Sequence, residues 1–381
     1  MPSEPPLTDA AWRRTFRRRL RNWYDRAARD LPWRRTNNAY HIWVSEIMLQ
    51  QTQVATVVPY FERFLKAFPS VTQLANAGEQ TVLRHWEGLG YYRRARQMHS
   101  AAKRIVAEHR GKIPREADLL RDLPGIGPYT AGAILSIAFD AREPILEANT
   151  IRLVARLLAI TEDVGSTKVQ NLMWSFSDEL LPRKEVGLFN QALMELGSLI
   201  CTPKSPSCDA CPVEDLCLAN AKQLQHKIPV LKQKMSFEKV NEAAVVIRHR
   251  GQILIRQCGS KERWEGLWDF PRVPVTSVGK RPIGNELVRG VFELTGLTVR
   301  VGPRLMTIKH GVTRFRITLH CFAAELVSPR SDKAAQTETR WVKSGELVQF
   351  PLSSSARKLA ERLKSKETIL SSRRKQAVGQ K

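Results

Sequence analysis

The stretch "CTPKSPSCDACPVEDLC", residues 201–217, carries four of the chain's six cysteines: Cys201, Cys208, Cys211 and Cys217. Four thiolates this close together can enclose one metal centre, and a structural zinc ion is the first interpretation to consider. Zinc sites usually pair two short C-x2-C knuckles, whereas this stretch contains only one. A single contiguous loop of four ligands favours an iron–sulfur cube. The spacing therefore predicts a [4Fe–4S] cluster in this loop.

The segments on either side of the cysteine loop differ in their hydrophobic periodicity and composition. Before it, apolar residues recur every three to four positions and Pro and Gly pairs separate the runs, which is typical of consecutive helices. After it, short β-branched runs bounded by Gly predict strands, with one helix-like segment between them. We expect a helical domain at residues 1–223, a polar linker at 224–237, a smaller α+β domain at 238–352, and a C-terminal helix with a basic tail at 353–381.

The charge of the chain points to its partners. Its 381 residues include 61 Lys+Arg against 37 Asp+Glu, a net charge of +24, which favours nucleic acid first and an anionic membrane surface second. No apolar run approaches the ~18–20 residues of a membrane span, and the N-terminus lacks the apolar core of a signal peptide. We expect an intracellular, cytoplasmic protein, associated with the nucleoid if its source is a prokaryote.

A second motif, "LPGIGPYTAGAIL" at residues 123–135, places Gly125 and Gly127 in a turn between two helical patterns. Such a turn leaves backbone N–H groups free at a helix start, where they can cradle a phosphate. A simple αα-hairpin turn would have the same sequence pattern. The motif therefore predicts a hairpin and allows a phosphate contact.

Two further stretches contain acids among apolar residues. In "WVSEIMLQQTQ", residues 43–53, Glu46 is either an exposed helix acid or a buried one, and burial would make it a proton donor near neutral pH. Gln51 and Thr52 follow it in an uncharged polar stripe. In "PILEANTIRLVARL", residues 144–157, Glu147 precedes a helix for which Asn149 or Thr150 is the expected N-cap. A solvated loop acid is the alternative for Glu147.

These motifs, with "GLGYYRRAR" at 88–96 and "FNQALMELG" at 189–197, occur in the order expected of the MutY family of adenine DNA glycosylases. The chain resembles this family over nearly its whole length. The hairpin resembles the helix-hairpin-helix motif, and the cysteine loop resembles the [4Fe–4S] loop of the endonuclease III superfamily. The resemblance implies an enzyme that excises adenine mispaired with 8-oxoguanine or guanine in double-stranded DNA.

The resemblance also implies roles for the residues that match the family's motifs. Glu46 would protonate the adenine ring, and Glu147 would stabilise the positive sugar, although the family usually has aspartate there, in "LDGN" rather than "LEAN". Tyr129 occupies the position of a lysine nucleophile in relatives that cleave the strand, which implies a monofunctional enzyme. With these two acids, Tyr129 and Asn149 would complete the catalytic set by lining the pocket and positioning the groups around the sugar. The implied substrate-binding residues are Gln191 at the edge of the adenine, Gln51 in the space that the adenine leaves, Thr52, Leu89 and Tyr91 around the opposing base, and Gly125 and Gly127 at the DNA backbone.

The second domain resembles a Nudix fold, with "NELVRGVFELTGL" in the place of the metal-binding helix. Nudix hydrolases need an R-E-x-x-E-E pattern to hold Mg²⁺, and two of its three carboxylates are missing here. The resemblance therefore implies recognition of 8-oxoguanine rather than hydrolysis. The recognition loop, "F-S-H" in the family, corresponds to residues 312–314, where Thr313 keeps a hydroxyl.

Two other functions remain open. An endonuclease III-like glycosylase/lyase would share the hairpin and the cysteine loop. A lesion-binding or mismatch-binding relative with impaired catalysis is the second alternative, because glutamate stands at position 147. The expected protein is a monomer that acts on DNA and needs no membrane.

Overall fold

The computed structural model describes residues 9–231, 236–260, 262–276, 284–328 and 337–365. The chain separates into two compact units, the first of residues 1–76 and 97–234 and the second of residues 77–96 and 235–381. The basic tail predicted near the C-terminus lies outside the described residues beyond residue 365. Within the described ranges, no helix combines the length and apolarity needed to cross a membrane.

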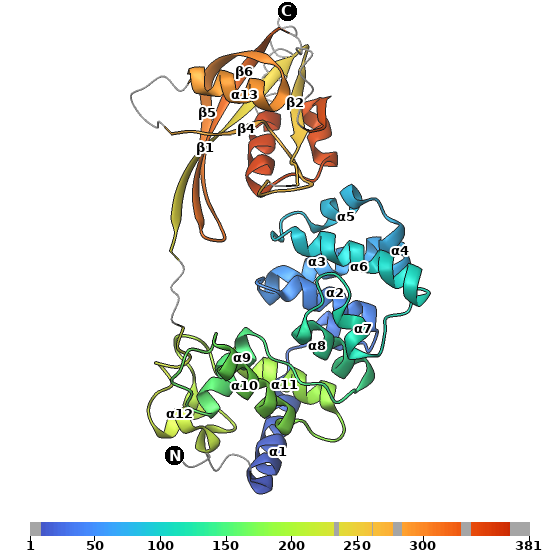
Figure 1. Cartoon of the computed structure of the whole chain (residues 1–381), viewed down its shortest axis with the longest axis vertical. Coiled ribbons are helices and arrows are strands. Elements are labelled where there is room, and N and C mark those ends of the chain that lie inside the picture. The colour runs from blue at the N-terminus through green and yellow to red at the C-terminus, as the bar shows by residue number, and fades with distance from the viewer. Residues whose placement is uncertain (1–8, 232–235, 261, 277–283, 329–336, 366–381) are drawn as a thin grey trace, which may run out of the picture. The chain divides into compact units, whose positions relative to one another are not determined.

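The first unit is helical (Figure 1). Its longer helices are α1 (Ala10–Ala27), α2 (Ala39–Leu49), α3 (Val54–Ala67), α4 (Val71–Asn76), all but the first turn of α6 (Arg93–His109), α7 (Ala117–Arg121), α8 (Pro128–Phe139), α9 (Ala148–Leu157), α10 (Thr167–Leu180) and α11 (Val186–Leu199). A short helical turn, η2 (Pro32–Arg34), lies between α1 and α2, and three more follow α11, namely η3 (Cys208–Ala210), η4 (Glu214–Leu216) and α12 (Leu218–Ala221).

The core of this unit brings the two ends of its sequence together. Phe16 and Leu20 of α1 are fully buried against apolar residues of α9, α10 and α11. α8 packs between α2 and α11, so the hairpin motif is tied to both. The start of the predicted linker belongs to this core as well, because Ile228 is buried in it and Val230 accepts a hydrogen bond from Val164 N at 3.1 Å.

The second unit is built on a mixed sheet. Its strands are β1 (Glu238–His249), β2 (Gln252–Gln257), β3 (Trp268–Asp269), β4 (Arg272–Pro274), β5 (Thr298–Val312), β6 (Phe315–Ser328) and β7 (Thr339–Val342). The order is β3-β2-β1-β6-β5, with β4 paired to β1 and β7 to β2. β1 and β6 are parallel, and the other pairs are antiparallel. The helices are α5 (Glu79–Trp86), α13 (Gly284–Thr295), η5 (Ser344–Gln349) and one at 354–365.

Helices cover both faces of this sheet. Because side chains alternate along a strand, Ala243 and Val245 of β1 pack in one core with Leu287 of α13. Ala244 packs on the opposite face, in a core that includes Leu359 of the helix at 354–365. The predicted smaller α+β domain is thereby confirmed, including the helix predicted from the "NELVRGVFELTGL" segment.

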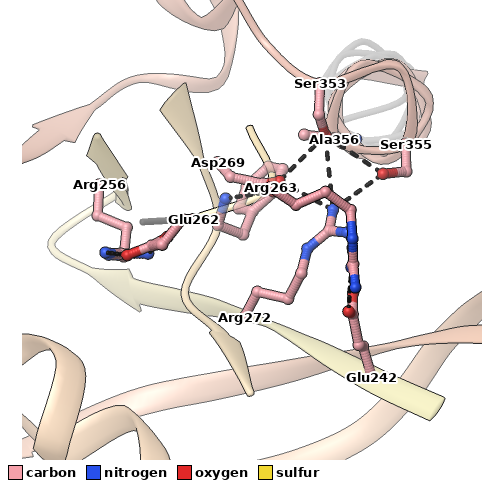
Figure 2. A network of polar contacts seen from close by, with 10 residues as sticks. Glu242, Arg256, Glu262, Arg263, Asp269, Arg272, Ser353, Ser355 and Ala356 are labelled. Carbon is pink, nitrogen blue, oxygen red and sulfur yellow. Dashed lines mark hydrogen bonds and ion pairs between the residues drawn. The ribbon is translucent and has the colours of Figure 1, made fainter. Parts of the chain in front are cut away.

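A buried polar network ties the start of the 354–365 helix to the sheet (Figure 2). Ser353 donates to Asp269 Oδ2 at 3.0 Å and accepts from Ala356 N at 3.1 Å, so it caps the helix. Arg272 donates to Asp269 Oδ2 at 2.8 Å and to Ser355 Oγ at 2.9 Å. These contacts fix the first turn of the helix against β3 and β4.

Candidate active site

A cavity of about 750 Å³ lies in the helical unit, between α2, α8, α9 and α11. It brings together seven residues singled out from the sequence, namely Glu46, Gln51, Thr52, Tyr129, Glu147, Asn149 and Gln191. Their positions in the sequence span about 145 residues, so the helical packing and not local sequence assembles the site. The arrangement is a polar pocket in which two carboxylates face one space.

Glu46 is the more buried of the two acids. Its helix, α2, starts at Asn38, whose side chain accepts from Tyr40 N at 2.9 Å. Glu46 is 4% exposed, and burial raises its pKa to about 7, with the charge of Glu147 adding to the rise. A short hydrogen bond from the Tyr129 hydroxyl acts in the opposite direction. The sequence left Glu46 as either an exposed or a buried acid, and the structure shows that it is buried. With a pKa of about 7, the carboxyl group is half protonated near neutral pH.

Tyr129 lies in the first turn of α8, directly after Pro128 at the start of the helix. Its hydroxyl donates to Glu46 Oε2 and lies 3.3 Å from Met194 Sδ. Burial and the nearby Glu46 carboxylate hold the pKa of Tyr129 well above its ordinary value. The phenol therefore stays neutral and serves as a hydrogen-bond donor in the pocket.

Glu147 is itself the N-cap of α9, so the expectation that Asn149 or Thr150 caps this helix is wrong. Its side chain accepts from Asn149 N at 2.8 Å and from Thr150 N at 3.0 Å, and Thr150 completes a capping box. A glutamate can do this because its longer side chain folds back onto the first turn. Burial raises the pKa of Glu147, while the two backbone donors lower it. The carboxylate is half-buried and faces the cavity.

Asn149 is held between this cap and a buried arginine. Its Nδ2 donates to Glu147 Oε2 at 3.2 Å, and its Oδ1 accepts from Arg152 Nη2 at 2.9 Å. Arg152 also donates to Gly197 O at 2.7 Å. α11 approaches here so closely that a Cβ at Gly197 would lie 2.8 Å from Asn149 Cβ and 3.0 Å from Asn149 O. The position of Asn149 therefore depends on a glycine in α11.

Replacing Gly197 with alanine is expected to lower the free energy of unfolding by about 1–3 kcal/mol, because the added methyl group must displace the backbone of Asn149. Denaturant unfolding measures this change. Gly345→Ala is the matched control, since no heavy atom lies within 4 Å of a Cβ there. Equal stability of the two variants would show that α9 and α11 can separate without cost.

Sequence reasoning missed a cluster of charges on the wall of the cavity. Glu195 of α11 is fully buried and accepts from Arg29 Nη2 at 2.6 Å and from Arg34 Nη2 at 2.9 Å. Although burial opposes ionisation, these two arginines hold the pKa of Glu195 at about 2. Arg34 in turn lowers the pKa of Glu46. The sequence did contain a signal for this cluster, because Glu195 lies among the apolar residues of "FNQALMELG". An acid in such a pattern is seldom buried without a positively charged partner.

Glu195→Gln should lower the free energy of unfolding by about 3–5 kcal/mol, because it leaves the arginine charges without their buried partner. The control is Glu185→Gln, whose side chain is 66% exposed in its ion pair with Arg21 and whose loss should cost under about 0.5 kcal/mol. Chemical denaturation of both variants is the measurement. Similar losses for the two would contradict a structural role for the cluster.

The other predicted residues lie outside this cavity. Gly125 has a φ of +80°, and a Cβ there would lie 2.9 Å from Gln97 Cβ, so the hairpin turn requires glycine. Gly127 is exposed and is the N-cap of α8. Leu89, Tyr91 and Thr313 belong to the second unit. Tyr91 and Thr313 are exposed with positive φ angles of 47° and 49°, whereas Leu89 is buried.

The four cysteines of the loop line one small cavity beside α9. Arg156, 1% exposed, donates to Cys201 Sγ at 3.2 Å, and its other acceptors among the described residues are carbonyl oxygens. Cysteine thiolates would compensate this buried charge, as they do when they bind iron. In the described ranges, no three His, Cys, Asp or Glu could hold a single metal ion. Four sulfur donors around one cavity, beside a buried positive charge, fit an iron–sulfur cluster.

Three family models match the chain. They are the HhH-GPD superfamily base excision DNA repair protein over residues 44–179, the NUDIX domain over residues 242–362, and the iron-sulfur binding domain of endonuclease III over residues 201–217. The last match confirms the predicted iron–sulfur cofactor of the cysteine loop. The first two confirm the predicted helical glycosylase fold and the Nudix-like domain.

The similar proteins are DNA glycosylases. A solved thermostable thymine-DNA glycosylase is 26% identical, with a TM-score of 0.50 over 55% of this chain and 97% of that chain. The adenine DNA glycosylase of Rattus norvegicus is 44% identical over 80% of this chain, and the match spans 59% of the rat protein. Those of Homo sapiens and Buchnera aphidicola subsp. Schizaphis graminum are 32% and 38% identical over 92% and 67% of this chain. Because both of these relatives are matched over 74% of their own length, this chain belongs to the adenine DNA glycosylase family.

Proposed function

We propose that this protein is a monofunctional DNA glycosylase that hydrolyses the N-glycosidic bond of adenine mispaired with 8-oxoguanine or guanine. One observation carries the proposal: Glu46 and Glu147 face one cavity, and the pKa of Glu46 is about 7. A carboxyl group that holds a proton near neutral pH can act as a general acid. Adenine is a poor leaving group until a ring nitrogen accepts such a proton.

The first step is the rotation of the adenine out of the duplex, since its glycosidic bond is inaccessible inside the stack. Glu46 then transfers its proton to a ring nitrogen of the flipped base. The Tyr129 hydroxyl donates to the other side of the Glu46 carboxyl group and holds its orientation. Gln191, which lines the cavity and accepts from Tyr24 OH at 3.1 Å, contacts the edge of the base.

Glu147 acts on the sugar. As the C–N bond breaks, positive charge develops on the sugar carbon, and the Glu147 carboxylate stabilises it as in retaining glycosidases. Two backbone N–H groups and the Asn149 amide orient this carboxylate. Water then attacks the sugar carbon and gives its proton to the Glu46 carboxylate, which has already protonated the base, and the products are free adenine and an abasic site.

Further residues contact the rest of the duplex. Gln51, which lines the cavity, fills the space that the adenine leaves, and Thr52 beside it contacts the opposing base. Leu89, Tyr91 and Thr313 contact the opposing base, and Gly125 and Gly127 contact the DNA backbone. The net charge of +24 supports attraction to the phosphates of DNA.

The four loop cysteines would hold the [4Fe–4S] cluster, which would link distant residues of the loop to one another, while Arg156 of α9 contacts the loop at Cys201. The partner is double-stranded DNA carrying the mispair, and the protein acts as an intracellular monomer. The match spans only 59% of the rat relative and 53% of that from Mus musculus. The activity and substrates of those whole proteins are therefore proposed for this chain.

Two alternatives are separated by one assay on duplexes with A:8-oxoguanine, A:G or an oxidised pyrimidine. The proposed enzyme should break the strand at adenine only after alkali treatment, and borohydride should trap no covalent complex. Efficient trapping would instead indicate a glycosylase/lyase, which the absence of an amine at Tyr129 argues against. Binding without any adenine release would indicate the lesion-binding relative.

A further inference from the structure

The loop at residues 88–91, here called the GLGY loop, has a conformation that its sequence alone does not favour. Gly88, Gly90 and Tyr91 have positive φ angles of 102°, 72° and 47°. For a tyrosine this backbone conformation costs energy and persists only where the surroundings impose it. The Trp86 indole donates to Gly90 O at 3.1 Å, which holds one side of the loop. The result is a Tyr91 side chain that is 43% exposed.

Arg94 contacts the loop through its guanidinium group. Its guanidinium lies 5.4 Å from the ring centroids of both Trp86 and Tyr91, within the range of cation–π contact. Arg94 Nη2 is also 3.4 Å from Gly90 O. The exposed tyrosine is therefore attached to a buried framework at the end of α5.

The residue immediately before the loop is tied to the far end of the chain. Glu87 has a side chain only 7% exposed, and it accepts two hydrogen bonds from Arg357, from Nε at 2.5 Å and from Nη2 at 2.9 Å. Arg84 Nη1 donates to the same carboxylate at 3.0 Å. A two-point contact between a guanidinium and a carboxylate fixes orientation as well as distance.

Arg357 is itself held in place within the second unit. It donates to Leu347 O at 2.9 Å and to Phe350 O at 2.7 Å. It belongs to the 354–365 helix, whose first turn is fixed to the sheet by the network of Asp269, Arg272 and Ser353 in Figure 2. A continuous set of buried polar contacts thus leads from the sheet to Glu87.

We propose that Glu87 and Arg357 are positioning residues through which the Nudix-like sheet sets the conformation of the GLGY loop, and thereby the preference for 8-oxoguanine over guanine opposite adenine. The proposal rests on the proposed function for the identity of the base. Its structural part, the dependence of the loop on Arg357, stands on the contacts alone.

The test uses the full chain with Glu87→Gln, Arg357→Ala and the double variant. Arg300→Ala is the matched control, because Arg300 forms an exposed ion pair with Glu325 in the same unit. Hydrogen exchange of the Gly88 and Leu89 amides, which donate to Tyr92 OH and Trp86 O, should accelerate about tenfold in both single variants, no further in the double variant, and not in the control. Glu87→Gln keeps Arg357 and its carbonyl contacts, and unchanged exchange of amides far from the loop distinguishes a local effect from a general loss of stability.

Recognition is measured separately, as the ratio of dissociation constants for duplexes containing A:G and A:8-oxoguanine, on a Glu46→Gln background that retains the adenine. This ratio should fall about tenfold with Glu87→Gln and with Arg357→Ala. Unchanged exchange in the loop, or faster exchange with an unchanged ratio, would overturn the proposal. A parent protein with no preference between the two duplexes would instead contradict the proposed function, while the exchange measurement would still decide whether Arg357 sets the loop.

Discussion

Glu46→Gln should reduce adenine excision by about 10²- to 10⁴-fold while binding of the mispaired duplex is retained, because the amide has no proton to give to the base. The wild-type rate should fall as the pH rises through about 7, since burial raises the pKa of Glu46 to that value. Single-turnover excision across a pH series measures both effects. Unchanged excision by the variant would rule out Glu46 as the acid.

The same substitution gives an independent signature in stability. The folded-state pKa of Glu46 lies above its ordinary value of 4.5, so its contribution to stability is present at low pH and is lost as the pH rises through about 7. Glutamine cannot ionise. The free energy of unfolding of Glu46→Gln, relative to wild type, should therefore rise by about 2–3 kcal/mol between pH 5 and pH 8. A constant difference would contradict the buried, protonated acid.

Glu147→Gln should reduce excision by at least about 10²-fold, because the charge that stabilises the positive sugar is removed. Glutamine still offers an oxygen to the backbone N–H groups of Asn149 and Thr150, so the cap of α9 should survive. The loss should therefore appear in the rate and much less in the melting temperature. Single-turnover rates and thermal unfolding of the same preparation separate the two.

The matched control is Glu147→Asp, which keeps the charge and shortens the side chain to the length usual in the family. An activity at or above the wild-type rate is the expected result, because aspartate is itself a good N-cap and leaves more room in the cavity. Full activity of Glu147→Gln would show that the carboxylate is only a helix cap.

Much of the site could be predicted from the sequence because its residues lie in short motifs with their own local structure. The turn at Gly125 and Gly127 identified the start of α8 and therefore Tyr129. The close spacing of the four cysteines identified the iron–sulfur loop. Glu147 was found as an acid near a helix start, but its role as the N-cap was missed, since Ser, Thr, Asp and Asn are the residues that usually occupy that position.

What could not be predicted depends on contacts between distant parts of the chain. The ion pairs of Glu195 with Arg29 and Arg34 span more than 160 residues, and no spacing rule relates them. The contact between Glu87 and Arg357 spans 270 residues and places residues 77–96 in the second unit, although their sequence continues the helical pattern of the first. Periodicity records which face of a helix is buried, but not against which partner.

The most direct test of the central claim is alkali-revealed strand cleavage of a duplex with one A:8-oxoguanine pair, with the unaltered protein in excess over DNA. We expect the adenine to be lost in a single rapid phase, which would mean that a glutamate at position 147 can do the work of the usual aspartate. Tight binding of the duplex with no loss of adenine would contradict the account, and the protein would then be a lesion-binding member of its family.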